Sequence, residues 1–157
     1  GMPSGVVTEG LGFVYNGCMG VFDPRPGMTG SLAPGKARFT SMAPTMVFKD
    51  NKPTLLIGAP GGTYIAMGVV QGIVNVIDFG MDAEKAVAAP RFSATSDIIE
   101  IVNRIPRFVQ EELEAQGYRF RRYPLGFHFA GVHAIRITKD GIDGGADPGR
   151  DGMALSI

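Results

Sequence analysis

Residues 54–78 constrain this chain more than any other stretch, because two different periodicities meet there at one glycine-rich corner. The stretch reads TLLIGAPGGTYIAMGVVQGIVNVID. Residues 54–57 form a short apolar run typical of a strand, and apolar residues recur at helical spacing from about residue 63 to residue 78. Pro60, Gly61 and Gly62 separate the two runs and indicate a tight turn. The pattern predicts a strand, a corner and a helix that, being apolar nearly all round, is buried on more than one face.

Gly61 and Gly62 make the corner a candidate site. Without β-carbons, these residues can adopt backbone dihedrals closed to other residues and let a ligand approach the backbone closely. They also precede a helix, whose first N–H groups lack carbonyl partners and, together with the helix dipole, favour negative charge. The corner therefore predicts a site for an anion or a developing oxyanion. From these residues alone, a sharp turn that binds nothing is an equally good explanation.

Composition and charge exclude several classes of partner. The 157 residues, 45% of them hydrophobic, are enough for one globular domain with a substantial core. Fifteen basic and fifteen acidic side chains balance, so we expect neither a nucleic-acid surface nor an anionic-membrane surface. The single cysteine, Cys18, excludes an internal disulfide framework and a CxxC pair. His128 and His133 are isolated and have no carboxylate at ligand spacing, so we expect them to be structural, and we expect no metal and no cofactor.

The sequence also bears on localisation. No stretch is long enough and free enough of glycine to span a bilayer, and the first residues lack the basic and apolar regions of a signal peptide. As written, the chain is therefore expected in the cytoplasm.

The composition and the predicted secondary structure of the chain change near residue 40. Residues 1–39 are predicted to form an irregular arm rich in glycine and proline, too apolar for a solvated tail, and residues 40–157 an α+β domain. Within that domain, residues 50–53 are predicted to link two strands as a hairpin, and Phe108, Val109 and Leu113 to face inward from a helix. The helices are expected to cover a mostly antiparallel sheet. The predicted helices are 63–78, 83–88 and 107–116, and the predicted strands 45–49, 54–57, 98–102, 118–123, 132–138 and a short one around residue 142.

Several ordered motifs resemble one family. They are TSMAPT at 40–45, GAPGG at 58–62, NVIDFG at 75–80, AVAAPRF at 86–92 and, nearer the two ends, SGVV at 4–7, Asn16, DPRPG at 23–27 and GADP at 145–148. Together they resemble the small subunit of gamma-glutamyltransferases, also called gamma-glutamyl transpeptidases, which are N-terminal-nucleophile hydrolases. The resemblance runs over nearly the whole chain.

The resemblance implies an αββα sandwich, a large-subunit partner, and an enzyme that transfers a gamma-glutamyl group from an amide to water or an amino acid. Family members are often periplasmic or secreted. A threonine at the start of the small subunit attacks the substrate carbonyl, with its own amine as the base. Gly61 and Gly62 match the oxyanion-hole glycines, and Thr40 and Ser41 match serines that bind the substrate's alpha-carboxylate. Asn16 matches a further substrate-binding position. Hydroxyls placed like those of Thr40 and Ser41 also commonly cap turns.

This chain departs from the family pattern in two ways. The family's catalytic threonine lies some tens of residues before the segment matching SGVV, so we expect an incomplete sandwich without the strand that carries the nucleophile, and no activity from the isolated chain. The unpaired strand edge would favour self-association. In gamma-glutamyl-specific members an aspartate holds the alpha-amino group; Val21 stands at about that position, and Cys18 replaces a nearby glutamine. Valine cannot bind an ammonium group, so broader amide substrates are expected.

Three classes of function remain open at this point. The first is part of a gamma-glutamyltransferase-like enzyme, and the second is a non-catalytic binding or assembly module derived from that family. The third treats residues 58–63 as a phosphate loop, but they lack the lysine of a P-loop and the spacing of a dinucleotide fingerprint.

Overall fold

A computed structural model describes residues 3–155 of the chain. The chain divides into two compact units, Gly1–Thr40 and Ser41–Ile157.

The first unit is built on a small hairpin. Strands β1 (Pro3–Val7) and β2 (Val14–Asn16) pair antiparallel, and a short 3-10 helix, η1 (Cys18–Val21), follows. The segment after it turns at Asp23, whose carboxylate accepts hydrogen bonds from the backbone N–H and the guanidinium of Arg25. The first unit thus combines two short strands and a 3-10 helix with longer irregular segments.

The centre of the second unit is a four-stranded antiparallel sheet, with strand order β3-β4-β8-β9. Its strands are β3 (Thr45–Lys49), β4 (Lys52–Gly58), β8 (His133–Thr138) and β9 (Gly141–Ala146). The β3–β4 hairpin confirms the predicted pairing, but its turn is shorter than the predicted 50–53. Asp50 and Asn51 both have positive φ, at 51° and 59°, so two residues suffice to reverse the chain and β4 begins at Lys52.

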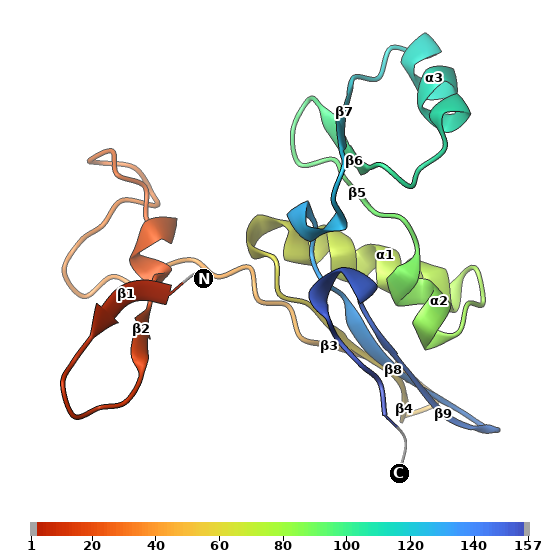
Figure 1. Ribbon diagram of the computed structural model, residues 1–157, viewed down its shortest axis with the longest axis horizontal. Coiled ribbons are helices and arrows are strands. Elements are labelled where there is room, and N and C mark those ends of the chain that lie inside the picture. Colours follow the sequence, from red (N-terminus) through yellow and green to blue (C-terminus); the bar gives the residue numbers. More distant parts are fainter. Residues whose placement is uncertain (1–2, 156–157) are drawn as a thin grey trace. The chain divides into compact units, whose positions relative to one another are not determined.

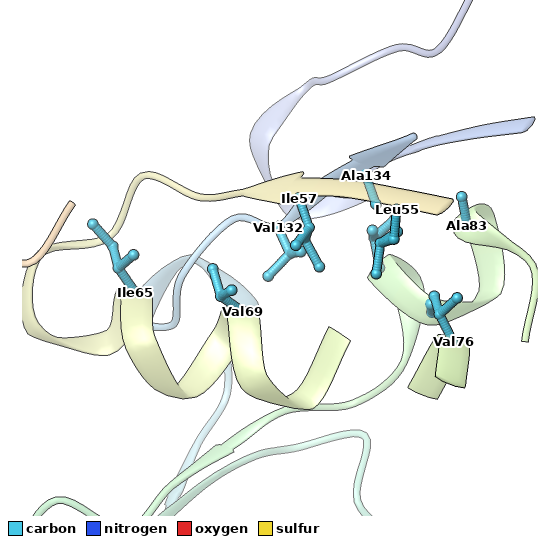
Figure 2. Packing of buried hydrophobic residues seen from close by; sticks show 10 residues of the cluster. Leu55, Ile57, Ile65, Val69, Val76, Ala83, Val132 and Ala134 are labelled. Atoms are coloured by element: carbon cyan, nitrogen blue, oxygen red, sulfur yellow. The ribbon is translucent and has the colours of Figure 1, made fainter. Parts of the chain in front are cut away.

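Two helices cover one face of this sheet (Figure 1). α1 (Ile65–Ile77) follows a 3-10 turn, η2 (Gly62–Tyr64). α2 (Ala83–Ala88) has the predicted bounds, and its N-cap is Asp82, whose side chain accepts a hydrogen bond from the Lys85 N–H. Figure 2 shows the core between these helices and the sheet. Its buried members are Leu55, Ile57, Ile65, Val69, Val76, Ala83, Ala86, Val87, Val132 and Ala134.

The prediction that α1 is buried on more than one face is wrong for this chain. Its core-facing stripe, which includes Ile65, Val69 and Val76, is buried, as the spacing predicts. The second apolar stripe is more open, because Val70 is 53% exposed and Ile77 is 51% exposed. The main sheet covers one side of the helix, and the opposite side stays about half exposed at Val70 and Ile77.

A second, three-stranded sheet has the order β5-β6-β7. β5 (Phe92–Ser93) pairs antiparallel with β6 (Ile99–Val102), whereas β6 and β7 (Phe120–Tyr123) are parallel. This pair corrects the expectation of one mostly antiparallel sheet. The connection between β6 and β7 includes α3 (Arg107–Ala115), as a parallel pair requires a crossover. Phe108 of α3 is 67% exposed, so its predicted inward orientation is also wrong.

The two remaining 3-10 helices, η3 (Gly126–His128) and η4 (Pro148–Arg150), flank the start of β8 and the end of β9. A buried ion pair ties this region to the end of α2. The Arg91 guanidinium donates to the Asp147 carboxylate, which also accepts from the backbone N–H of Val132 and Gly149. No helix among residues 3–155 is long and apolar enough to cross a membrane.

Candidate functional site

The candidate site is the turn between β4 and α1. β4 ends at Gly58, and Gly61 and Gly62 then adopt φ values of 144° and 60°. Both values lie in the region that favours glycine, so a residue with a side chain would be strained at either position. The Tyr64 N–H donates to the Gly61 carbonyl at 3.2 Å and closes the turn into η2. The sequence TLLIGAPGG therefore folds into the strand and corner that it predicts.

The backbone N–H groups of Gly61 and Gly62 have no hydrogen-bond acceptor within residues 3–155. Gly62 is exposed and Gly61 is partly exposed, so a ligand can reach this edge of the turn. Two adjacent N–H groups, at the start of a helix whose dipole favours negative charge, can stabilise an oxyanion.

The other side of the turn is closed by the segment that leads into β8. The Gly131 N–H donates to the Pro60 carbonyl at 3.0 Å. A β-carbon placed on Gly61 would lie 2.6 Å from the Ala130 Cα, whereas one on Gly62 would meet nothing within 4 Å. Gly61 is therefore needed for both its dihedrals and its lack of a side chain, and Gly62 for its dihedrals alone.

A polar cluster lies next to the turn and joins four elements. The Tyr64 hydroxyl donates to Glu100 Oε2 at 2.6 Å and lies 2.8 Å from His128 Nε2. The Tyr123 hydroxyl donates to Glu100 Oε1 at 2.8 Å, and the rings of Tyr123 and His128 stack with centroids 3.5 Å apart. Arg121 contributes a longer ion pair to Glu100, at 3.8 Å.

The cluster fixes the charge states of its two central members. Burial, followed by the nearby Glu100 carboxylate, raises the pKa of Tyr64 to about 12. The hydrogen bond from Tyr64 is the main cause that lowers the pKa of Glu100 below its ordinary value. At neutral pH the cluster thus holds a neutral phenol beside a carboxylate anion.

The other predicted site residues lie in both units. Ser41 is half-buried in the second unit, on the segment that leads to β3. That segment passes close to the end of β4, because a β-carbon on Gly58 would lie 4.0 Å from the Pro44 Cα. Thr40 and Asn16 belong to the first unit, where the Asn16 side chain accepts a hydrogen bond from the Cys18 N–H at 3.0 Å.

Within residues 3–155, no group of three or more His, Cys, Asp or Glu side chains is arranged to hold a metal ion. Cys18 is a free thiol.

A sequence model of one family, gamma-glutamyltranspeptidase, matches residues 2–157. The chain belongs to the gamma-glutamyltranspeptidase family. Its α+β fold is accordingly of the N-terminal-nucleophile hydrolase type, as the motifs predicted.

Curated relatives within the family carry two kinds of name. The chain is 39% identical, over 97% of its length, to the acylase ACY 1 proenzyme of Pseudomonas sp. strain V22. It is 32% identical, over 98% of its length, to the glutathione hydrolase proenzyme of Bacillus subtilis strain 168. The matched region spans 27% and 26% of those two relatives. The chain thus corresponds to about a quarter of each proenzyme.

Solved structures of the family have the same fold. The gamma-glutamyltranspeptidase of Pseudomonas nitroreducens complexed with L-DON superposes with a TM-score of 0.86 at 30% identity, over 99% of this chain and 87% of that one. The cephalosporin acylase of Bacillus halodurans gives a TM-score of 0.87 at 27% identity, over 98% of this chain and 29% of that one.

Sequence reasoning missed the cluster around Glu100. Tyr64, Glu100 and the neighbouring Tyr123 and His128 lie in three separate stretches of the sequence, and their spacing does not indicate a cluster. The one available signal was His128, which stands between Phe127 and Phe129 and for which a structural role was expected.

Proposed function

We propose that this chain is the C-terminal part of the small subunit of a gamma-glutamyltransferase-like enzyme. The enzyme transfers an acyl group, gamma-glutamyl or a related one, from an amide to water or to an amino acid. The observation that carries the proposal is the pair of unpaired backbone N–H groups at Gly61 and Gly62, in a chain of this family.

The proposed chemistry uses this pair as an oxyanion hole. When a hydroxyl attacks the amide carbonyl, negative charge develops on the carbonyl oxygen, and N–H groups already in position stabilise it. One such donor contributes about 3 kcal/mol to transition-state stabilisation. The attacking threonine is proposed to come from a segment outside these 157 residues, because no threonine here matches the family's nucleophile, and the isolated chain is proposed to be inactive.

Thr40 and Ser41 are proposed to bind the substrate's carboxylate through their hydroxyl groups, with Asn16 as a further substrate contact. Val21 is proposed to lie at about the position where gamma-glutamyl-specific members place the aspartate that holds the alpha-amino group. A substrate without that amino group should therefore bind as well as a gamma-glutamyl substrate. The identity to an acylase proenzyme, 39% against 32% for a glutathione hydrolase, supports a broader acyl specificity.

An incomplete sandwich and a large-subunit partner are proposed from the open face of the main sheet. The face opposite α1 and α2 forms an open depression whose lining includes Met46, Leu56, Ile135 and Ile142, and only the C-terminal segment, with Met153 and Leu155, lies along it among residues 3–155. Met46 is 59% exposed and Ile142 is 73% exposed. Apolar residues on a regular sheet face favour cover by another layer, and the second half of an αββα sandwich would supply it.

The experiment compares the 157-residue chain with the polypeptide encoded by its whole locus. Each is assayed with a gamma-glutamyl anilide and with a glutaryl anilide, which keeps the carboxylate but lacks the alpha-amino group. We expect no hydrolysis by the isolated chain, and hydrolysis of both anilides at similar rates by the whole product.

Two results would contradict the proposal. Activity in the isolated chain would show that the nucleophile lies within it. An inactive whole product that folds normally would instead favour the non-catalytic binding or assembly module.

A further inference from the structure

The cluster of Tyr64, Glu100, Tyr123 and His128 lies beside the glycine turn but is not part of the proposed oxyanion hole. Its members come from η2, β6, β7 and η3. The side chains of Glu100 and His128 are only 14% and 29% exposed. Four polar groups held this closely on separate elements define a specific arrangement, since each unpaired group would carry a desolvation cost.

The protons in the cluster have one consistent assignment. A carboxylate can only accept, so the phenolic protons of Tyr64 and Tyr123 both go to Glu100. The Tyr64 oxygen can then only accept from His128 at 2.8 Å, which places a proton on His128 Nε2. The chain of donors therefore runs from His128 to Tyr64 and on to Glu100.

These hydrogen bonds help to join the glycine turn to the segment that precedes β8. The turn segment runs from Pro60 to Tyr64, and the segment leading into β8 lies against it. At one end the Gly131 N–H holds the Pro60 carbonyl, and in the middle Ala130 packs on Gly61. At the other end the bond between Tyr64 and His128 joins the same two segments.

Two consecutive glycines are the residues least able to hold their own backbone orientation, because glycine has the widest range of accessible dihedrals. A rotation of the peptide groups at Gly61 and Gly62 would turn their N–H groups away from a developing oxyanion. Tyr64 follows these glycines within η2, and its N–H donates to the Gly61 carbonyl. A fixed Tyr64 side chain therefore restrains the turn from its helical side.

We propose that Tyr64 is a positioning residue for the oxyanion hole, held by Glu100 and by the Nε2 proton of His128. This inference rests on the proposed function of Gly61 and Gly62. The network stabilises one orientation of the two N–H groups and does not itself contact the substrate.

The test uses the whole enzyme that contains this chain, with Tyr64→Phe as the main variant. Phenylalanine keeps the ring and removes the hydroxyl through which Glu100 and His128 hold the turn. We expect kcat per titrated active site to fall about tenfold or more, since small misplacements of catalytic groups cost up to about 100-fold. The KM for the donor should change less than about twofold. Tyr118→Phe is the matched control, because Tyr118 is 52% exposed and lies outside the cluster.

A pair of substitutions at His128 covers the case in which Tyr64→Phe fails to assemble. His128→Gln keeps an N–H donor at a similar distance and should retain most of kcat, whereas His128→Leu should not. A purely structural role would lower the fraction of titratable sites in both variants and leave kcat per site unchanged, which would overturn the proposal.

The proton assignment is tested without catalysis, by ¹⁵N NMR of the His128 imidazole in the whole enzyme labelled at histidine. We expect His128 Nε2 to be protonated and its chemical shift to move in Tyr64→Phe; an unprotonated Nε2 would overturn the proposed donor chain. A wild-type whole enzyme without activity would count against the proposed function and hence the role of the turn. An active wild type with an equally active Tyr64→Phe would overturn the positioning role alone.

Discussion

Ala130 packs directly on Gly61, with its Cα 2.6 Å from the place where a β-carbon of residue 61 would lie. The neighbouring Gly62 has open space at the same position. The two glycines of the turn therefore differ in what a side chain would cost.

Gly61→Ala should destabilise the chain by about 3 kcal/mol or more, because it adds a clash with Ala130 to backbone strain at φ 144°. Gly62→Ala should cost about 1–2 kcal/mol, from the left-handed conformation alone. Urea denaturation of both variants measures the difference. Equal losses would mean that Ala130 does not restrict residue 61.

Asp147→Asn tests the buried ion pair with Arg91. The two side chains are only 5% and 8% exposed, so removing one charge leaves the other buried and uncompensated. The expected loss is about 3–5 kcal/mol in the free energy of unfolding. Asp97→Asn is the control, because its carboxylate is 95% exposed and its 3.8 Å pair with Arg119 should contribute little. A small effect at Asp147 would contradict the buried pair.

The raised pKa of Tyr64 predicts a specific loss of stability at high pH. Its pKa is about 12 in the folded chain, against an ordinary value of 10.0. The folded state therefore holds the phenolic proton more tightly than the unfolded state, and this contribution is complete below pH about 10 and lost as pH rises toward about 12. Unfolding measured from pH 8 to 12 should show this decline, and Tyr64→Phe should lack it. An identical decline in both proteins would assign it elsewhere.

Ile142→Asp probes the open face of the main sheet. Ile142 is 73% exposed within this chain, so the substitution should leave the unfolding midpoint nearly unchanged. If the proposed second layer covers this face, the buried aspartate should instead prevent assembly with the proposed large subunit. Co-purification of the two subunits measures this. Normal assembly of the variant would place the partner on another surface.

Val21→Asp should restore preference for gamma-glutamyl donors. A carboxylate at this position could pair with the alpha-amino group, and a charged hydrogen bond of this kind contributes about 1.5–3 kcal/mol. In the whole enzyme, the ratio of kcat/KM for gamma-glutamyl anilide to that for glutaryl anilide should rise about tenfold or more. Val21→Asn is the matched control without the charge. An unchanged ratio would show that Val21 is not at the amino-binding position.

Much of the local structure could be predicted because it depends on neighbours in the sequence. The helical spacing after the glycine corner predicted α1, and Asp82 predicted the start of α2. The family could likewise be identified from ordered motifs such as GAPGG and NVIDFG, and the match over residues 2–157 confirms it.

The errors arose where a residue's surroundings come from distant parts of the chain. The exposed side of α1, including Val70 and Ile77, has the same apolar character as its buried side. The parallel pairing of β6 and β7 likewise depends on how the chain crosses over between them. Periodicity shows which residues share a face, but it does not show whether another element covers that face.

The sequence by itself determined the strand, the two-glycine corner, the helix after it and the family, since these depend on residues close together or in a fixed order. Only the tertiary structure decided that Ala130 packs on Gly61. It also brought Glu100, Tyr123 and His128 together around Tyr64. Tyr64 and His128 are 64 positions apart. Their hydrogen bond exists because β8 pairs with β4 and brings the segment before it against the turn, and no local pattern encodes that pairing.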